Sequence, residues 1–154
     1  MPNRNLITPL LALLFAPLAL SLSACHFHRS FINDKGDIDE GRIFLNQFYN
    51  DVRLKDTTAL SRLPSDSLKK LMHQKHVSLG TITSFVNLRL GNYHDYTVDT
   101  VYTNRTEGSI NNTVYKYKLR VVYERGDLEE LVGFVKNGSA GPLLNFYYVT
   151  PVNP

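Results

Sequence analysis

The pattern of apolar residues changes along this chain, and each change predicts a different kind of structure. Residues 6–22 are predominantly apolar and contain two prolines. From residue 38 to about residue 75, apolar residues recur at spacings of three and four, as in amphipathic helices. After residue 79, β-branched and aromatic residues alternate with polar ones between turn-forming pairs, which is typical of strands. The pattern therefore predicts an apolar N-terminal segment, then helices, then a sheet.

The longest predicted helix runs from Ile38 to Leu54. Its apolar positions form one stripe: Ile38, Phe44, Leu45, Phe48, Tyr49 and Val52. Asp37, with Glu40 three residues later, is an acidic variant of the capping box that begins many helices. This helix has one face to bury.

Two shorter helical segments are predicted next. The first covers Lys55 to Leu63 and is stopped by Pro64, which cannot continue a helix. The second runs from Asp66 to about Lys75, with Ser65 as its N-cap.

Five strands are predicted in the second half of the chain. Turn chemistry separates most of them, at Gly91-Asn92, Gly126-Asp127 and Asn137-Gly138. Five strands in sequence imply one strongly curved antiparallel sheet. The predicted strands are Thr81 to Leu90, Tyr93 to Asn104, Thr113 to Arg125, Leu128 to Lys136 and Leu143 to Thr150.

The alternation is clearest in the strand that begins at Thr113. Apolar and aromatic residues occupy one face, and charged residues the other. One face should therefore meet the helices, while the other meets water or a partner. The apolar and aromatic set is Tyr115, Tyr117, Leu119, Val121 and Tyr123. The charged set is Lys116, Lys118, Arg120 and Glu124.

The N-terminal segment resembles a bacterial lipoprotein signal peptide. Arg4 supplies a positive start, the apolar region follows, and the sequence Leu22-Ser23-Ala24-Cys25 is similar to a lipobox. The resemblance implies removal of residues 1–24 and acylation of Cys25, which anchors the chain to a membrane. A transmembrane helix is the alternative, but the two prolines weaken it. In that family, Asp after the cysteine retains the protein at the inner membrane, so His26 implies the outer membrane of an organism that has two.

The length and composition of the chain after the signal peptide limit what it can form and bind. Without the 24-residue signal the chain has 130 residues, which is enough for one domain. Residues 25–36 are predicted to be a lipidated N-terminus and tether, followed by a domain at residues 37–154. A mature net charge of +2 gives no argument for nucleic-acid binding. Acylated Cys25 leaves no thiol for a disulfide. His26 and His28 are too few for a closed zinc site, so neither a metal nor another cofactor is expected.

Three helices followed by long antiparallel strands resemble the nuclear transport factor 2-like superfamily, an α+β cone. The resemblance covers Ile38 to Thr150 and includes the sequence from Leu79 to Ser84, which is similar to a Leu-Gly-x-Ile-x-Ser entry into a first strand. A cystatin-like fold, with one helix wrapped by a sheet, is the closest competitor. The resemblance implies a pocket where the curved sheet opens around the first helix.

Two sets of residues are candidates for chemistry in such a pocket. Enzymes of this superfamily place Asp, His and Tyr in it, and His94, Asp95, Tyr96 and Asp99 are the available candidates. Neighbouring residues on a strand point to opposite faces, which disfavours His94 and Asp95 as a catalytic pair, and no catalytic residue is assigned. Tyrosines are the candidates for binding a ligand or partner, although β-propensity alone also explains them as core residues. They are Tyr96, Tyr102, Tyr115, Tyr117 and Tyr148.

The sequence thus favours a lipid-anchored module of the bacterial envelope that binds a small apolar ligand or an envelope protein without catalysis. A small isomerase or dehydratase is one alternative, and an inhibitor or immunity protein is another; a homodimer is also compatible with the chain. An enzyme needs a buried Asp or His beside a second polar group in an open pocket. If aromatic rings fill the interior, the outer face of the sheet becomes the candidate surface.

Overall fold

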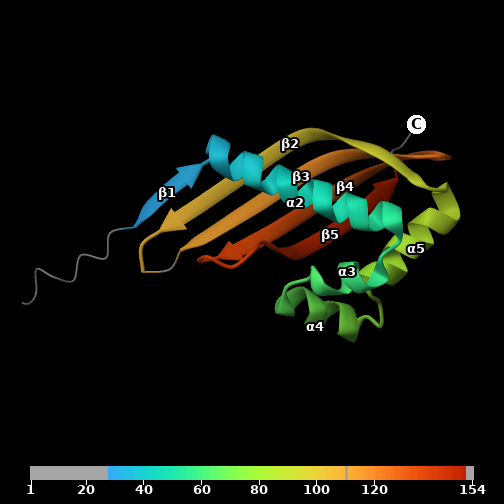
Figure 1. Ribbon diagram of the computed structural model, residues 1–154, viewed down its shortest axis with the longest axis horizontal. Coiled ribbons are helices and arrows are strands. Elements are labelled where there is room, and N and C mark those ends of the chain that lie inside the picture. Colours follow the sequence, from blue (N-terminus) through green and yellow to red (C-terminus); the bar gives the residue numbers. More distant parts are fainter. Residues whose placement is uncertain (1–27, 110, 152–154) are drawn as a thin grey trace, which may run out of the picture.

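The computed structural model describes residues 28–109 and 111–151. These residues form an α+β fold in which helices pack on an open five-stranded antiparallel sheet with the strand order β1-β2-β3-β4-β5 (Figure 1). The elements are β1 (Arg29–Ile32), α2 (Lys35–Leu54), α3 (Thr57–Arg62), α4 (Asp66–Gln74), α5 (Leu79–Leu90), β2 (Tyr93–Glu107), β3 (Asn112–Tyr123), β4 (Gly126–Asn137) and β5 (Leu143–Pro151). The coarse prediction of helices against an antiparallel sheet is confirmed.

Helix α2 begins three residues earlier than predicted. Asp34, not Asp37, is the N-cap, and its carboxylate accepts a hydrogen bond of 3.0 Å from the backbone N–H of Gly36. Asp37 lies in the first turn and is buried beside Arg105. The apolar stripe of α2 faces the sheet as predicted, with Phe44, Leu45, Phe48, Tyr49 and Val52 buried. Both aspartates fit the local pattern and both carboxylates lie near Arg105, so only the structure shows that Asp34 is the residue that caps the helix.

The two short helices agree with the prediction. Helix α3 lies within the predicted segment and ends before Pro64. Helix α4 begins after Ser65, whose hydroxyl accepts a hydrogen bond of 3.3 Å from the N–H of Leu68. Local capping chemistry was enough to place both.

The predicted strand at Thr81 to Leu90 is wrong, because these residues belong to helix α5. Ser78 caps the helix by accepting a hydrogen bond of 3.0 Å from the N–H of Thr81. Gly91 ends it at a φ of 82°, and a side chain there would collide with Glu124. The buried residues Leu79, Thr83 and Val86 follow helical spacing. The Leu79 to Ser84 sequence is therefore a helix start, not an entry into a strand.

The prediction of a tether at residues 25–36 is also wrong in part. Residues Arg29–Ile32 form β1, which pairs with the far end of β2, with Arg29 opposite Glu107 and Ile32 opposite Asn104. The strand's partners lie more than 70 residues away in the chain, so local pattern could not find it. Five strands exist as predicted, but β1 replaces the expected first one.

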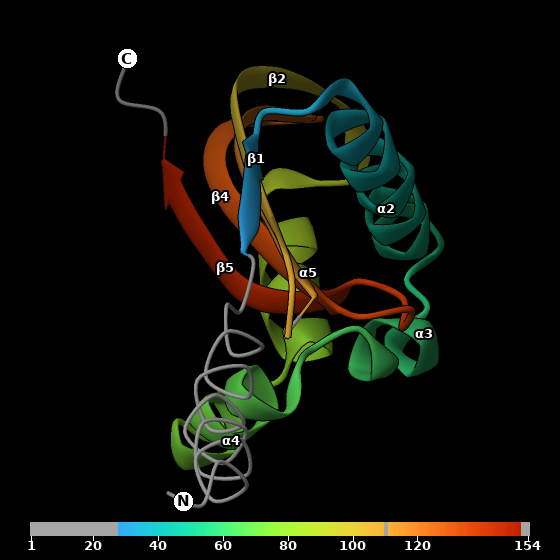
Figure 2. The ribbon, with the colours of Figure 1, turned by 90° about the vertical axis from the view of Figure 1, so that its left-hand side faces the viewer.

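One face of the sheet forms the core against α2, which lies to one side of the strands in Figure 2. The predicted inward residues of β3 are all buried there. Gly41 of α2 lies so close to the sheet that a β-carbon would collide with the hydroxyl of Tyr117. This close approach leaves little room between helix and sheet.

Candidate functional site

Aromatic rings fill the space between α2 and the sheet. Phe44 and Phe134 lie with ring centroids 4.3 Å apart, and Tyr49 stacks on Tyr93 at 5.1 Å. Tyr117 is fully buried, and its hydroxyl donates a hydrogen bond of 3.1 Å to the carbonyl of Ile38. Burial raises the pKa of Tyr117 to about 12. The interior beneath α2 is thus a packed core.

Glu130 is a carboxylate inside this core, 0 % exposed. It accepts hydrogen bonds from the hydroxyls of Tyr49 at 2.8 Å and Tyr123 at 3.1 Å, and Tyr147 also bonds to it. Burial raises the pKa of Glu130 above its ordinary value, although the three tyrosines act in the opposite direction. Its oxygens are occupied by tyrosine donors, so a substrate could reach it only after the core opens.

Sequence reasoning missed Glu130, although a signal was present. In β4 the inward positions are Leu128, Glu130, Val132 and Phe134, so the alternation places a charge among apolar residues. Such a position marks a buried carboxylate that needs partners.

The residues His94, Asp95 and Tyr96 line a shallow pocket of 240 Å³ between α2 and the start of β2. A register irregularity at residues 93–95 interrupts the strand alternation, and both His94 and Asp95 are exposed and line this pocket. The expectation that they face opposite sides is therefore wrong. Asp95 accepts a hydrogen bond of 2.8 Å from the N–H of Tyr96, whose hydroxyl donates to Asn46 at 2.7 Å. Neither titratable group is buried, so the arrangement lacks the enclosed acid or base that the enzyme alternative requires.

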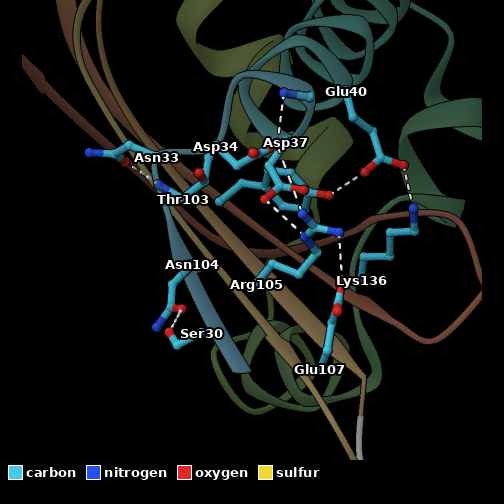
Figure 3. Close-up of polar contacts among 12 residues, drawn as sticks. Ser30, Asn33, Asp34, Asp37, Glu40, Thr103, Asn104, Arg105, Glu107 and Lys136 are labelled. Atoms are coloured by element: carbon cyan, nitrogen blue, oxygen red, sulfur yellow. Dashed lines mark hydrogen bonds and ion pairs between the residues drawn. The ribbon is translucent and has the colours of Figure 1, made fainter. Parts of the chain in front are cut away.

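A polar cluster joins β1, α2, β2 and β4 at the start of α2 (Figure 3). The guanidinium of Arg105 lies 3.3 Å from the buried carboxylate of Asp37, 2.7 Å from Glu107 and 3.9 Å from Asp34. It also lies over the ring of Phe31 at 4.5 Å. Burial raises the pKa of Asp37, and Arg105 opposes the shift. The cation and its carboxylates hold β1 and α2 to the sheet.

Glu40 extends this cluster toward β4. It is paired with Lys136 and accepts a hydrogen bond from Tyr115. Burial acts to raise its pKa, but the contacts with Lys136 and Tyr115 together with nearby positive charge outweigh it and lower the pKa. Each of these two cations, Arg105 and Lys136, therefore lies beside a carboxylate, and the pairs connect α2 with β2 and β4. In the described part of the chain, no group of three or more His, Cys, Asp and Glu residues could hold a metal ion.

An apolar hollow of 400 Å³ lies between α5 and the ends of β4 and β5. It is lined by Ile82, Val86, Leu128 and Val149 and by the exposed side chain of Phe85. Arg89 also lines the hollow, with its guanidinium 5.3 Å from the centre of the Phe85 ring.

The sheet face opposite α2, which we call the outer face, carries a group of exposed apolar side chains. Strand register places them together, because residues directly opposite in neighbouring strands share a face. Tyr148 is 60 % exposed and Tyr102 is 38 % exposed. The other exposed members are Ile32, Leu131 and Leu143, and the half-buried Val114, Val135 and Phe146 lie between them.

A basic row runs along the middle of the outer face on β3. It consists of Lys116, Lys118 and Arg120. Lys118 pairs with Glu129 at 2.9 Å, and the ammonium of Lys116 lies 5.7 Å from the centre of the Tyr102 ring. The outer face therefore combines an apolar area with positive charge.

The structure separates the five tyrosines that the sequence singled out. Tyr115 and Tyr117 belong to the core, and Tyr96 packs at its edge against Tyr49. Tyr102 and Tyr148 lie on the outer face. The sequence pattern could not distinguish these environments, because aromatic residues suit both faces of a strand.

Comparison with protein-family models, curated proteins and solved structures found no match to this chain. Among the described residues, no helix is long and apolar enough to cross a membrane. Cys25 and the predicted signal peptide lie outside the described residues.

Proposed function

We propose that this protein is an envelope lipoprotein, anchored by acylated Cys25, whose outer face binds another protein without catalysis. The observation that carries the proposal is the group of exposed apolar side chains on the outer face. Exposed apolar residues gathered in one area mark interaction surfaces more often than scattered ones do. The anchoring half of the proposal rests on the lipobox-like sequence alone.

The chemistry of the outer face indicates its partner. Tyr148 and Leu131 lie directly opposite each other on neighbouring strands, and both side chains are exposed and can enter a pocket of another protein. Lys118 of the basic row is paired with Glu129, so Lys116 and Arg120 are the members that favour a partner whose apolar surface is bordered by acidic residues. An inhibitor or immunity protein would be one form of this function, with an envelope enzyme or toxin as the partner.

The filled interior supports protein binding over a small ligand held beneath α2. Aromatic rings and Glu130 with its tyrosines occupy that space. As part of the proposal we keep the resemblance to the nuclear transport factor 2-like superfamily, which the position of α2 on the antiparallel sheet supports. Its characteristic pocket would then be filled in this chain.

The anchor is tested by Cys25→Ser. Wild-type protein should sediment with membranes, and the variant should be released, because without the acyl chains the chain loses about 0.8 kcal/mol of membrane affinity for each buried methylene. Metabolic labelling with a fatty acid gives a second measurement. Continued membrane retention of an unlabelled Cys25→Ser variant from which residues 1–24 have been removed, as checked by mass, would contradict the anchor.

The outer face is tested by Tyr148→Ala, with Leu88→Ala as the matched control. Leu88 is 75 % exposed and lies on α5, so its loss also removes an exposed apolar side chain without touching the outer face. After cross-linking in intact cells, a specific envelope partner should be recovered with wild type and Leu88→Ala. Recovery with Tyr148→Ala should fall by about tenfold or more, as for a central interface residue. Equal recovery with both variants would contradict binding through the outer face.

A further inference from the structure

We propose that one end of the sheet rests against the bilayer to which Cys25 is attached. This end, called here the anchored end, consists of Gly108, Ser109 and Asn111 and of the turn at residues 138–142. The inference rests on the proposed acylation of Cys25 and adds the orientation of the domain on the membrane.

The length of chain between the anchor and the first strand carries the argument. Only residues 26–28 separate Cys25 from Arg29, where β1 begins. Four residue steps span at most about 14 Å when fully extended. The tether of twelve residues expected from the sequence would reach roughly 40 Å. The formation of β1 therefore holds the domain much closer to the bilayer than the sequence predicted.

Strand register identifies which part of the domain this short segment holds down. Arg29 is paired with Glu107, the last residue of β2, and Gly108 follows directly. The N–H of Gly138 donates a hydrogen bond of 2.8 Å to the carbonyl of Asn111, which joins the second turn to the same end. In Figure 1, β1 lies at the end of the sheet opposite α5. Both turns must consequently lie near the anchor.

The chemistry of the anchored end suits a layer of lipid headgroups. Its members among the described residues are small and uncharged: Gly108, Ser109, Asn111, Gly138, Ser139, Ala140, Gly141 and Pro142. The described members are exposed apart from the half-buried Pro142. The cations near this end are Arg105 and Lys136, which have carboxylate partners, and Arg29, which lies opposite Glu107 in the strand register. The contact therefore needs no anionic lipid and should persist at high salt.

This orientation decides what the rest of the domain can reach. Strand β2 has 15 residues, so its two ends lie roughly 40 Å apart or more. The hollow beside α5 and the pocket of His94 lie at the end away from the anchored end. The outer face runs between the two ends and is open to a protein that lies beside the domain on the same membrane.

The absence of any other cysteine allows a direct test in the full acylated chain. Ser139→Cys places the one free thiol at the anchored end, and Ser84→Cys places it on exposed α5 as a matched control. Each purified lipoprotein is labelled with a fluorophore and inserted into phosphatidylcholine vesicles whose headgroups carry a contact quencher. The probe at Ser139→Cys should lose most of its emission and the probe at Ser84→Cys little.

Equal quenching at both positions would mean that the domain tumbles freely, which would overturn the inference while leaving the anchor intact. Failure of both proteins to remain with vesicles would overturn the anchor itself, and the orientation with it. A third protein carries Ser139→Cys and twelve Gly and Ser residues inserted between His28 and Arg29. Such a linker extends on average about 20 Å, so quenching should fall severalfold. Unchanged quenching would overturn the role of the short segment.

Discussion

Glu130 is the residue whose environment differs most from what its chemistry prefers. A carboxylate enclosed in an apolar core loses its hydration, and only partners can offset that loss. Here the partners are the hydroxyls of Tyr49, Tyr123 and Tyr147. Their rings pack in the core while their polar tips converge on one acid, so the cluster connects α2, β3, β4 and β5.

The raised pKa of Glu130 predicts a specific pH dependence of stability. The folded state holds the proton of Glu130 more tightly than the unfolded state does. The stabilisation that results from this proton is therefore complete below the ordinary pKa of 4.5 and is lost as pH rises through the raised pKa. Glu130→Gln cannot titrate. The free energy of unfolding of wild type, minus that of Glu130→Gln, should therefore decrease as pH rises from about 4.5.

Urea unfolding of both proteins across this pH range measures the difference, and all other titrating groups are common to the two. A difference that stays constant with pH would contradict a shifted pKa at Glu130. A difference that increases with pH would mean that the tyrosine hydrogen bonds outweigh burial and lower the pKa.

At the scale of elements, α5 shows two local signals in conflict. Threonine, isoleucine, phenylalanine and valine gave residues 81–90 the composition of a strand. The N-cap at Ser78 and the spacing of Leu79, Thr83 and Val86 indicated a helix. Helical spacing prevails because it buries one side of α5, which packs beside α3. The β-propensity of these residues contributes less free energy than the burial of this side of the helix.

Substitutions at Ser84 distinguish a helix from a strand at residues 79–90, because the order of stability of Ser84→Ala and Ser84→Val differs between the two. Ser84 is exposed on α5, so its side chain reports backbone preference with little packing. In a helix, Ser84→Ala should raise the free energy of unfolding by a few tenths of a kcal/mol, and Ser84→Val should leave the protein about 0.5 kcal/mol less stable than Ser84→Ala. Chemical denaturation measures both. In a strand the order would be reversed, with Ser84→Val the more stable variant.

At the scale of the whole molecule, the strands should differ in their resistance to local opening. Strand β3 is central, paired with β2 and β4 along its whole length. Strand β1 has four residues and, among the strands that the structure describes, pairs only with β2. In the Cys25→Ser protein without membranes, hydrogen exchange should be slowest in β3 and fastest among the strands in β1.

Equal protection of β1 and β3 would show instead that β1 opens only with the whole domain. The result also bears on the proposed orientation. If β1 detached, the segment from Cys25 to Lys35 would have ten residue steps and could extend about 35 Å. The Arg105 cluster beside Phe31 and Asp34 is what opposes that detachment.

The sequence by itself determined the class of fold, the helices up to residue 75, four of the five strands and the alternation of β3. Those features depend on local capping, turn chemistry and periodicity, which neighbouring residues express without the rest of the chain. It also contains the lipobox-like stretch at Cys25, a covalent signal that needs no fold.

Only the tertiary structure decided the structure of α5, the strand β1, the cap of α2 and the environment of each tyrosine. Strand β1, the burial of Asp37 and the environments of the tyrosines depend on contacts between residues far apart in the chain: β1 with the end of β2, Asp37 with Arg105, and Glu130 with Tyr49. For α5 and the cap of α2, local signals were compatible with two structures, and the fold decided between them. Composition could supply the tyrosines, but strand register and the position of α2 decided which ones fill the core and which ones, on the outer face, remain available to a partner.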